Sequence, residues 1–133
     1  MNYKASFCDP FKPDVIDLGI IEEEKVIQTF ESYDWNDYLE NMESAKDSEI
    51  FYSPSFEVEN VENKHAITLS AIEDNKWYVF YKRPKLVKKL FGLREKMDEN
   101  YVTEVFVQSD EEALSYLSAL LNNKLQLLDE KIK

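Results

Sequence analysis

Cys8 and His65 are the only thiol and the only imidazole in the chain, and a nucleophilic cysteine would need both. A cysteine becomes a thiolate at neutral pH when a base or a positive field lies beside it, whereas Cys8 is followed by Asp9. The sequence therefore favours a partly buried thiol and a histidine at the start of a strand, with no catalytic pair. One cysteine and one histidine also exclude an internal disulfide, cysteine-rich zinc sites and the HExxH motif.

Asp34, Asp37 and Glu40 form a row of carboxylates three residues apart on a predicted helix, where two of them could share a hard cation or act as acid and base. Calcium loops need a glycine at their sharp turn, and neither Gly19 nor Gly92 lies in an acidic stretch of that kind. Two glycines also cannot supply a glycine-rich phosphate loop. We therefore expect no metal and no cofactor, and interpret the row as the wet face of an amphipathic helix.

Residues 77–83, WYVFYKR, place bulky side chains on both sides of one predicted strand. Such a strand is either covered on both faces or presents aromatic groups to a partner. If exposed, the anchors would be Trp77, Tyr78 and Tyr81. Aromatic strands beside basic residues also stack single-stranded nucleic acid, but the net charge and the absence of a βαββαβ order disfavour that interpretation here.

Charge is distributed unevenly along the chain, which carries 16 basic and 27 acidic residues and a net charge of −11. Residues 17–62 hold 14 acids against Lys25 and Lys46, and we expect the basic segment, residues 82–96, to fold back onto this acidic half. The predicted acidic contact residues are Asp34, Asp37, Glu40 and Glu43. The predicted basic patch consists of Lys82, Arg83, Lys85, Lys88, Lys89 and Arg94.

The N-terminal half is predicted to hold an irregular arm over residues 1–14, because Pro10 and Pro13 disfavour helix there. A first helix is expected from Glu22, and a second one is expected after an N-cap at Asp34.

The rest of the chain predicts a sheet followed by one more helix. Alternating patterns predict strands over residues 56–60, 65–72, 77–82 and 101–108. Between them, residues 84–93 fit a short basic amphipathic helix or an extended loop. Ser109 and Glu112 form a capping box that begins a long helix with an apolar stripe reaching Ile132.

Together these elements predict one α+β domain over residues 1–133: an antiparallel meander of about four strands, with two N-terminal helices and a long C-terminal helix packed on it. The longest apolar run, residues 77–81, is far shorter than the roughly 20 residues that span a bilayer. With no signal peptide visible and a single cysteine, the sequence favours a cytoplasmic protein that is not bound to a membrane.

Three functional interpretations stay open. The favoured one is a small acidic, non-enzymatic domain that binds a protein, such as an inhibitor or immunity-type protein for a basic partner, with a homodimer also permitted. The second is a small-ligand or minor enzymatic domain, whose mark would be a pocket with a carboxylate of raised pKa. The third is single-stranded nucleic-acid binding through residues 77–96.

Overall fold

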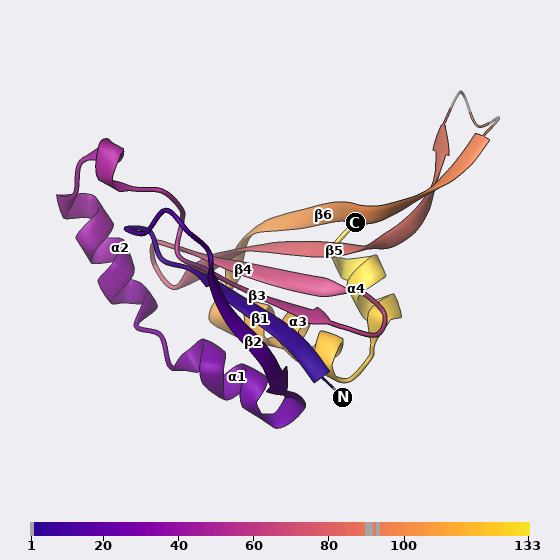
Figure 1. Ribbon diagram of the computed structural model, residues 1–133, viewed down its shortest axis with the longest axis horizontal. Helices are drawn as coiled ribbons and strands as arrows, with labels where there is room; N and C mark the ends of the chain where they lie inside the picture. Colours follow the sequence, from indigo (N-terminus) through magenta and orange to yellow (C-terminus); the bar gives the residue numbers. More distant parts are fainter. Residues whose placement is uncertain (1, 90–91, 93) are drawn as a thin grey trace.

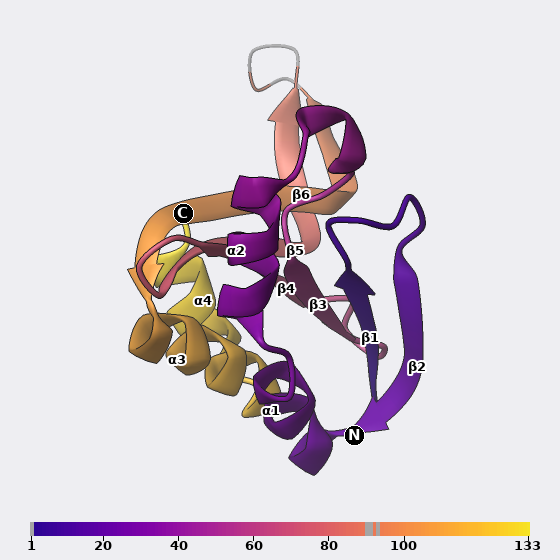
Figure 2. The same cartoon turned by 90° about the vertical axis from the view of Figure 1, so that its left-hand side faces the viewer.

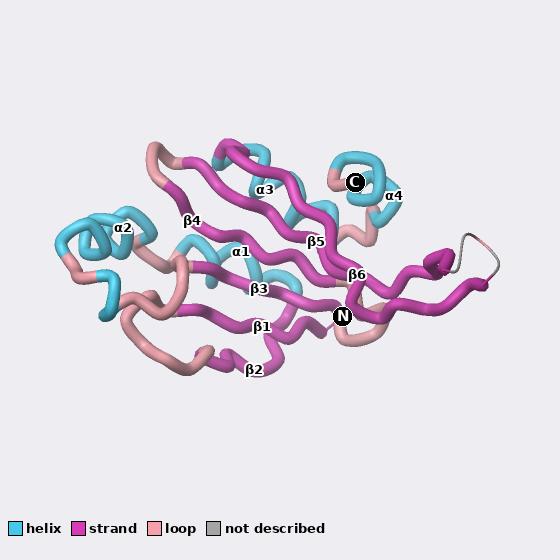
Figure 3. The backbone as a smooth tube through the Cα atoms, turned by 90° about the horizontal axis from the view of Figure 1, so that it is seen from above, coloured by secondary structure: helices cyan, strands magenta, loops and turns pink. Residues whose placement is uncertain are grey.

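The computed structural model describes residues 2–89, 92 and 94–133, and the side chain of Lys89 is not among the described parts. These residues form an α+β structure around an antiparallel sheet in the order β2-β1-β3-β4-β5-β6 (Figures 1 and 3). The strands are β1 (Asn2–Cys8), β2 (Ile16–Glu22), β3 (Ser55–Asn60), β4 (Ala66–Ile72), β5 (Lys76–Lys89) and β6 (Arg94–Ser109). The helices are α1 (Glu23–Glu31), α2 (Trp35–Ser44), the short 3-10 helix η1 (Asp47–Glu49), α3 (Asp110–Leu121) and α4 (Leu125–Lys131). The predicted class is confirmed, but the predicted count of about four strands is too low.

The predicted meander is present as β3 to β6, and the two additional strands come from the N-terminus. The irregular arm predicted for residues 1–14 was wrong, because residues 2–8 form β1 and pair with both β2 and β3. The two prolines lie beyond this strand, in the connection to β2, and so do not interrupt it. β2 carries an extra residue opposite the Ala5–Ser6 step of β1, and Gly19 adopts a φ of 75° at that bulge.

One face of the sheet is buried under the helices, which all lie on the same side (Figure 2). Every second residue of β1, β3, β4 and β5 points into this core, as the period of a strand requires. The side chains that the strands contribute are Tyr3, Ala5, Phe7, Phe56, Val58, Ile67, Leu69, Ala71, Trp77, Val79 and Tyr81. The opposite face, which we call the open face, has no helix over it among the described residues (Figure 2).

The single long C-terminal helix predicted from Ser109 is divided into α3 and α4. Its start is confirmed, since the Ser109 hydroxyl accepts from the amide of Glu112 and the Glu112 carboxylate accepts from the amide of Ser109. α3 ends where Asn123 adopts a φ of 56°, and the amide of Lys124 donates to the carbonyl of Ala119 at 2.8 Å. This is a Schellman ending, which asparagine tolerates better than most residues. α4 continues the apolar stripe, and its Leu128 is fully buried.

β5 and β6 continue past the body of the sheet as a protruding hairpin, which we call the arm and define as residues 84–89 and 94–100 (Figure 1). The short amphipathic helix and the loop predicted for residues 84–93 are therefore replaced by strand over 84–89, because residues 94–98 supply its backbone partners. Part of that predicted segment, Leu90, Phe91 and Leu93, lies outside the described residues. The pairing of β5 with β6 shifts register twice. One shift, at Arg83/Lys85, lies at the base of the arm, and the other, at Trp77/Val79, lies near the start of β5 in the body of the sheet.

Candidate partner-binding surfaces

Cys8 and His65 lie at opposite ends of the sheet's central strands. Cys8 pairs with Ser55 at one end of β3, and the carbonyl of His65 accepts from the amide of Asn60 at the other end. These positions are about 16 Å apart along the strand, too far for the imidazole to act on the thiol. The imidazole Nδ1 shares a hydrogen bond of 2.6 Å with the hydroxyl of Tyr81, and burial lowers the pKa of His65.

The acidic row at α2 is exposed to solvent, as expected for the polar face of an amphipathic helix. Asp34 is the helix N-cap and its carboxylate accepts from the amide of Asp37 at 3.1 Å, which confirms the predicted cap. In the described part of the chain, neither Glu40 nor Glu43 forms an ion pair, and no group of three or more metal-ligating side chains is present. Together, the four carboxylates form an acidic surface without ion pairs among the described residues, which we call the acidic helix face: Asp34, Asp37, Glu40 and Glu43.

The basic segment, residues 82–96, meets the acidic half, residues 17–62, through Lys82, whose ammonium group lies near Glu57 and Glu59. Its arm does not reach the acidic helix face. The arm protrudes at one end of the molecule and α2 lies at the other (Figure 1), so the two charges are separated along the longest axis. The predicted basic patch is also divided: Lys85, Lys88 and Arg94 are exposed on the arm, while Arg83 is buried. Lys89 was predicted to belong to it, but its side chain lies outside the described parts.

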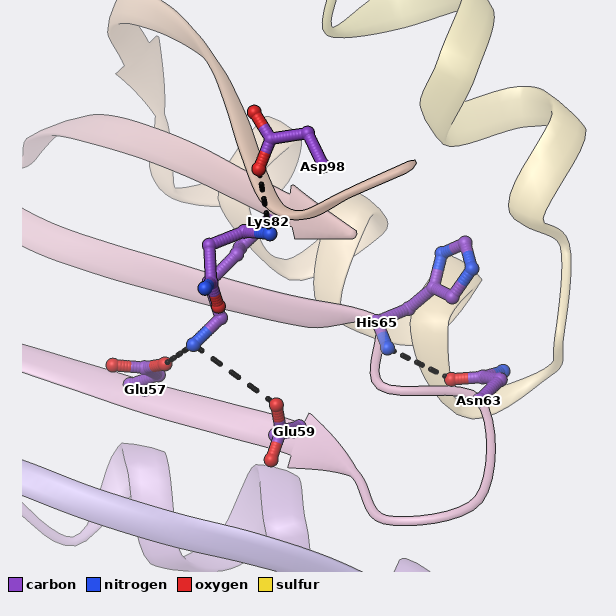
Figure 4. A network of polar contacts seen from close by, with 7 residues as sticks. Glu57, Glu59, Asn63, His65, Lys82 and Asp98 are labelled. Atoms are coloured by element: carbon purple, nitrogen blue, oxygen red, sulfur yellow. Dashed lines mark hydrogen bonds and ion pairs between the residues drawn. The ribbon is translucent and has the colours of Figure 1, made fainter. Parts of the chain in front are cut away.

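Lys82, the remaining member of the predicted patch, points across the open face of the sheet. Its ammonium group lies 3.4 Å from Glu57 and 3.9 Å from Glu59, both on β3 (Figure 4). The side chain of Lys4 is exposed on the neighbouring β1. The charges of this part of the open face are therefore largely matched within the protein.

Two of the three predicted aromatic anchors are buried. Trp77 packs between Phe30 and Trp35, and its indole NH donates to the carboxylate of Asp110 at 2.5 Å. Tyr81 is fully buried beneath the helices. Neither residue can therefore act as an exposed anchor, because both lie on the helix-covered side of β5. Only Tyr78, on the other side of that strand, is exposed.

Exposed apolar side chains gather on β5 and β6. Six of the ten large apolar residues exposed in the described chain lie on these two strands, and together we call them the ribbon surface. They are Tyr78, Leu86, Met97, Val102, Phe106 and Val107. Of these six residues, only Tyr78 is among the contact residues predicted from the sequence. The pattern of residues 101–108 predicts a strand but does not say which of its side chains are exposed. The register shift at Trp77/Val79 is a bulge that places two β6 residues, Phe106 and Val107, opposite Tyr78 of β5, and both are exposed.

β6 also forms one edge of the sheet. Among the described strands it pairs only with β5, although it is 16 residues long. An edge strand presents unpaired amide and carbonyl groups to which another strand can be added. The exposed carboxylates of Glu99 and Glu104 lie on this strand and limit indiscriminate pairing.

The carboxylates with a displaced pKa do not fit the pocket that a ligand-binding or enzymatic domain would need. The pKa of Glu112 is lowered by its hydrogen bonds with Ser109, and the pKa of Glu24 is lowered by hydrogen bonding at its own backbone and with Glu22. Both carboxylates are fully exposed to solvent. Neither of these two carboxylates therefore provides the raised-pKa group in a pocket that the ligand-binding interpretation predicts.

No protein-family model, curated protein or solved structure matches this chain. In the described part of the chain, no helix is long and apolar enough to cross a membrane.

Proposed function

We propose that this protein is a non-enzymatic domain that binds a protein partner through the ribbon surface. The observation that carries the proposal is the concentration of exposed apolar side chains on β5 and β6, while the other face of the same sheet is buried. Clusters of exposed apolar groups mark interaction sites, and aromatic residues dominate the binding energy of such sites. Tyr78 and Phe106 are the aromatic centre of this surface.

The partner that this surface suits has an extended segment with apolar side chains. Such a segment can pair with the free edge of β6, so that main-chain hydrogen bonds give affinity and Tyr78, Val102 and Phe106 give side-chain selectivity. A nucleic acid suits it less, because the exposed carboxylate of Glu104 lies on the same face as the aromatic pair and repels phosphates.

The acidic helix face is a second candidate surface for the same binding function. Its four carboxylates are exposed and, in the described part of the chain, make no ion pair, so their field is available to a basic partner. An inhibitor or immunity-type protein that covers a cationic site would use this face. The two surfaces predict different effects of salt, because an acidic contact weakens as ionic strength rises and an apolar one does not.

The test is an affinity capture from a lysate of the source organism, at low and at high salt, with three forms of the chain as bait. They are the wild type, the double variant Tyr78→Ser/Phe106→Ser, and the triple variant Asp37→Lys/Glu40→Lys/Glu43→Lys. We expect a stoichiometric protein that the wild type and the triple variant retain at both salts and the double variant loses. Ile20→Ser is the matched control, because Ile20 is equally exposed on β2, at the far edge of the sheet.

Loss of the captured protein only from the triple variant would move the interface to the acidic helix face. Equal capture by all variants, or capture of nucleic acid in place of protein, would contradict the proposal.

A further inference from the structure

Arg83 is a buried cation at the base of the arm, on the helix-covered side of the sheet. Only 4% of its surface is exposed. Its guanidinium lies between two aromatic rings, 4.3 Å from the centroid of Tyr81 and 4.9 Å from that of Tyr101. Cation–π contacts of this kind hold a guanidinium in a fixed plane and leave its edge available for hydrogen bonding.

The hydrogen bonds of this guanidinium are incomplete. Nη1 donates to the carbonyl of Tyr81 at 3.1 Å and to the hydroxyl of Thr103 at 2.5 Å, and that hydroxyl donates in turn to the carbonyl of Ile132. Nε is buried, and no group in the described part of the chain accepts a hydrogen bond from it. The nearest acid, Asp129 on α4, holds its carboxylate 3.6 Å from Nε, within range of an ion pair but too far to accept a hydrogen bond.

A hollow of about 460 Å³ opens at this guanidinium, a size within the usual range of small-ligand sites. Its charged lining consists of Arg83, Lys85 and Lys133 against the single carboxylate of Asp129, so the lining carries an excess positive charge. Its remaining walls are His65, Pro84, Tyr101 and Thr103. Because burial lowers the pKa of His65, its imidazole adds no positive charge near neutral pH.

We infer that this hollow is a binding site for a small phosphate monoester. With Asp129 moved aside, Nε of Arg83 would donate to a phosphate oxygen, Lys85 and Lys133 would balance the second negative charge of the phosphate, and Tyr101 would form a wall against the esterified group. A dianion matches the excess charge of the lining better than a carboxylate does. Asp129 competes with such a ligand, because its carboxylate occupies the approach to Nε, and its side chain is 55% exposed and able to move aside.

This site is independent of the ribbon surface, because the two lie on opposite sides of the sheet. Arg83, Tyr101 and Thr103 belong to the helix-covered side, whereas Val102 and Phe106 are exposed on β6. The phosphate site can therefore be tested without the protein partner.

His65 provides a site-specific probe, because it is the only histidine and it lines the hollow. The imidazole proton resonances are followed by NMR during titration with inorganic phosphate, phenyl phosphate and acetate, at constant pH and ionic strength. We expect saturable shifts with both phosphates, tighter for phenyl phosphate because its ring can stack on Tyr101, and at least tenfold weaker binding of acetate. No saturable shift with either phosphate, or equal affinity for acetate, would overturn the inference.

Variants separate a binding role from a structural one. Lys85→Gln/Lys133→Gln should weaken phosphate binding at least tenfold, and Asp129→Asn should tighten it several-fold, since a competing anion is removed. A purely structural ion pair between Asp129 and Arg83 predicts no gain in affinity on its removal. Lys88→Gln is the matched control, because Lys88 is an exposed cation on the same strand outside the hollow, and it should leave the affinity unchanged. Weakening by the control equal to that of the double variant, or no effect of Asp129→Asn, would contradict the assignment.

Discussion

Tyr78 on β5 and Phe106 on β6 meet edge to face on the open side of the sheet, with ring centroids 5.0 Å apart and an interplanar angle of 76°. Both rings remain exposed to solvent, since 37% of the surface of Tyr78 and 54% of that of Phe106 is accessible. Because both rings are largely exposed, their contact with each other buries little apolar surface in the free protein. A partner that covers the pair would bury the rest of that surface and stabilise the complex. The pair is therefore preorganised for contact and is the point at which the proposed interface is most sensitive to substitution.

Replacing Phe106 with serine should weaken the free energy of binding to the captured partner by about 2 kcal/mol or more, which raises Kd roughly 30-fold. The free energy of unfolding should change little. The reason is that the ring is exposed in the free protein and buried only in the complex. Isothermal titration gives the affinity, and urea unfolding gives the stability. Ile20→Ser should leave the affinity unchanged, and a loss of stability comparable to the loss of affinity would show that Phe106 is a core residue instead.

Replacing Trp77 with alanine should have the opposite signature. Trp77 is buried among Phe30 and Trp35 and donates to Asp110, so truncation leaves a cavity and an unpaired carboxylate. We expect a loss of about 3–5 kcal/mol in the free energy of unfolding, measured by urea denaturation. Tyr78→Ala on the adjacent position should cost much less. Similar costs for both variants would contradict the assignment of opposite faces.

The stability of the protein should fall as pH decreases through the range below 6.5. Burial lowers the pKa of His65 below its ordinary 6.5, an effect that Asp129 opposes and Arg83 reinforces. The unfolded chain therefore binds a proton at a higher pH than the folded chain, and unfolding becomes easier between pH 6.5 and the folded pKa. His65→Asn should flatten the pH dependence in this window. An unchanged slope in the variant would assign the dependence to other groups.

Removing the Ser109 hydroxyl should destabilise α3 without altering the ribbon surface. Ser109→Ala deletes the acceptor for the amide of Glu112, and losses of about 1 kcal/mol are usual for N-caps of this kind. Ser115→Ala is a suitable control, because Ser115 is an exposed serine within the same helix and caps nothing. Thermal unfolding of the two variants provides the comparison, and an equal loss in both would argue against the cap.

Val107 carries backbone strain that asparagine should relieve. Its φ is 56°, in the left-handed region that a β-branched residue rarely adopts, and its side chain is exposed. We expect Val107→Asn to raise the free energy of unfolding by up to about 1 kcal/mol, measured in urea. Val102→Asn, at an exposed strand position in the same β6 without a positive φ, should instead lower it. A loss of stability in both variants would mean that Val107 contributes more through its contacts than it costs in strain.

Local signals in the sequence were sufficient for several elements. The Asp34 cap, the Ser109–Glu112 box and the alternation of residues 56–60 each depend on neighbours in sequence, and each is confirmed. β1 was missed because Pro10 and Pro13 dominated a window in which Tyr3, Ala5 and Phe7 alternate. The division of the last helix depends on one backbone angle at Asn123, which an unbroken apolar stripe conceals.

The candidate surfaces were less accessible to sequence reasoning, because they depend on which side of a strand faces the helices. Tyr78 and Tyr81 lie on opposite sides of β5, and the pattern alone did not say which side is covered. The hollow at Arg83 brings together residues 65, 83, 101 and 129, whose proximity follows from strand pairing and from the return of α4. No short motif encodes such a juxtaposition.

The buried hydrogen bond from the Tyr3 hydroxyl to the carbonyl of Leu121 joins positions 118 residues apart in the chain. Ile132, close behind α4, is also fully buried. Because β1 precedes α3 in the chain, the inward side chain of Tyr3 gains the Leu121 carbonyl as its partner only after residues 110–121 have been synthesised. Until then, the part of the sheet face that α3 and α4 cover stays exposed on the growing chain, which favours binding by chaperones that act early in synthesis.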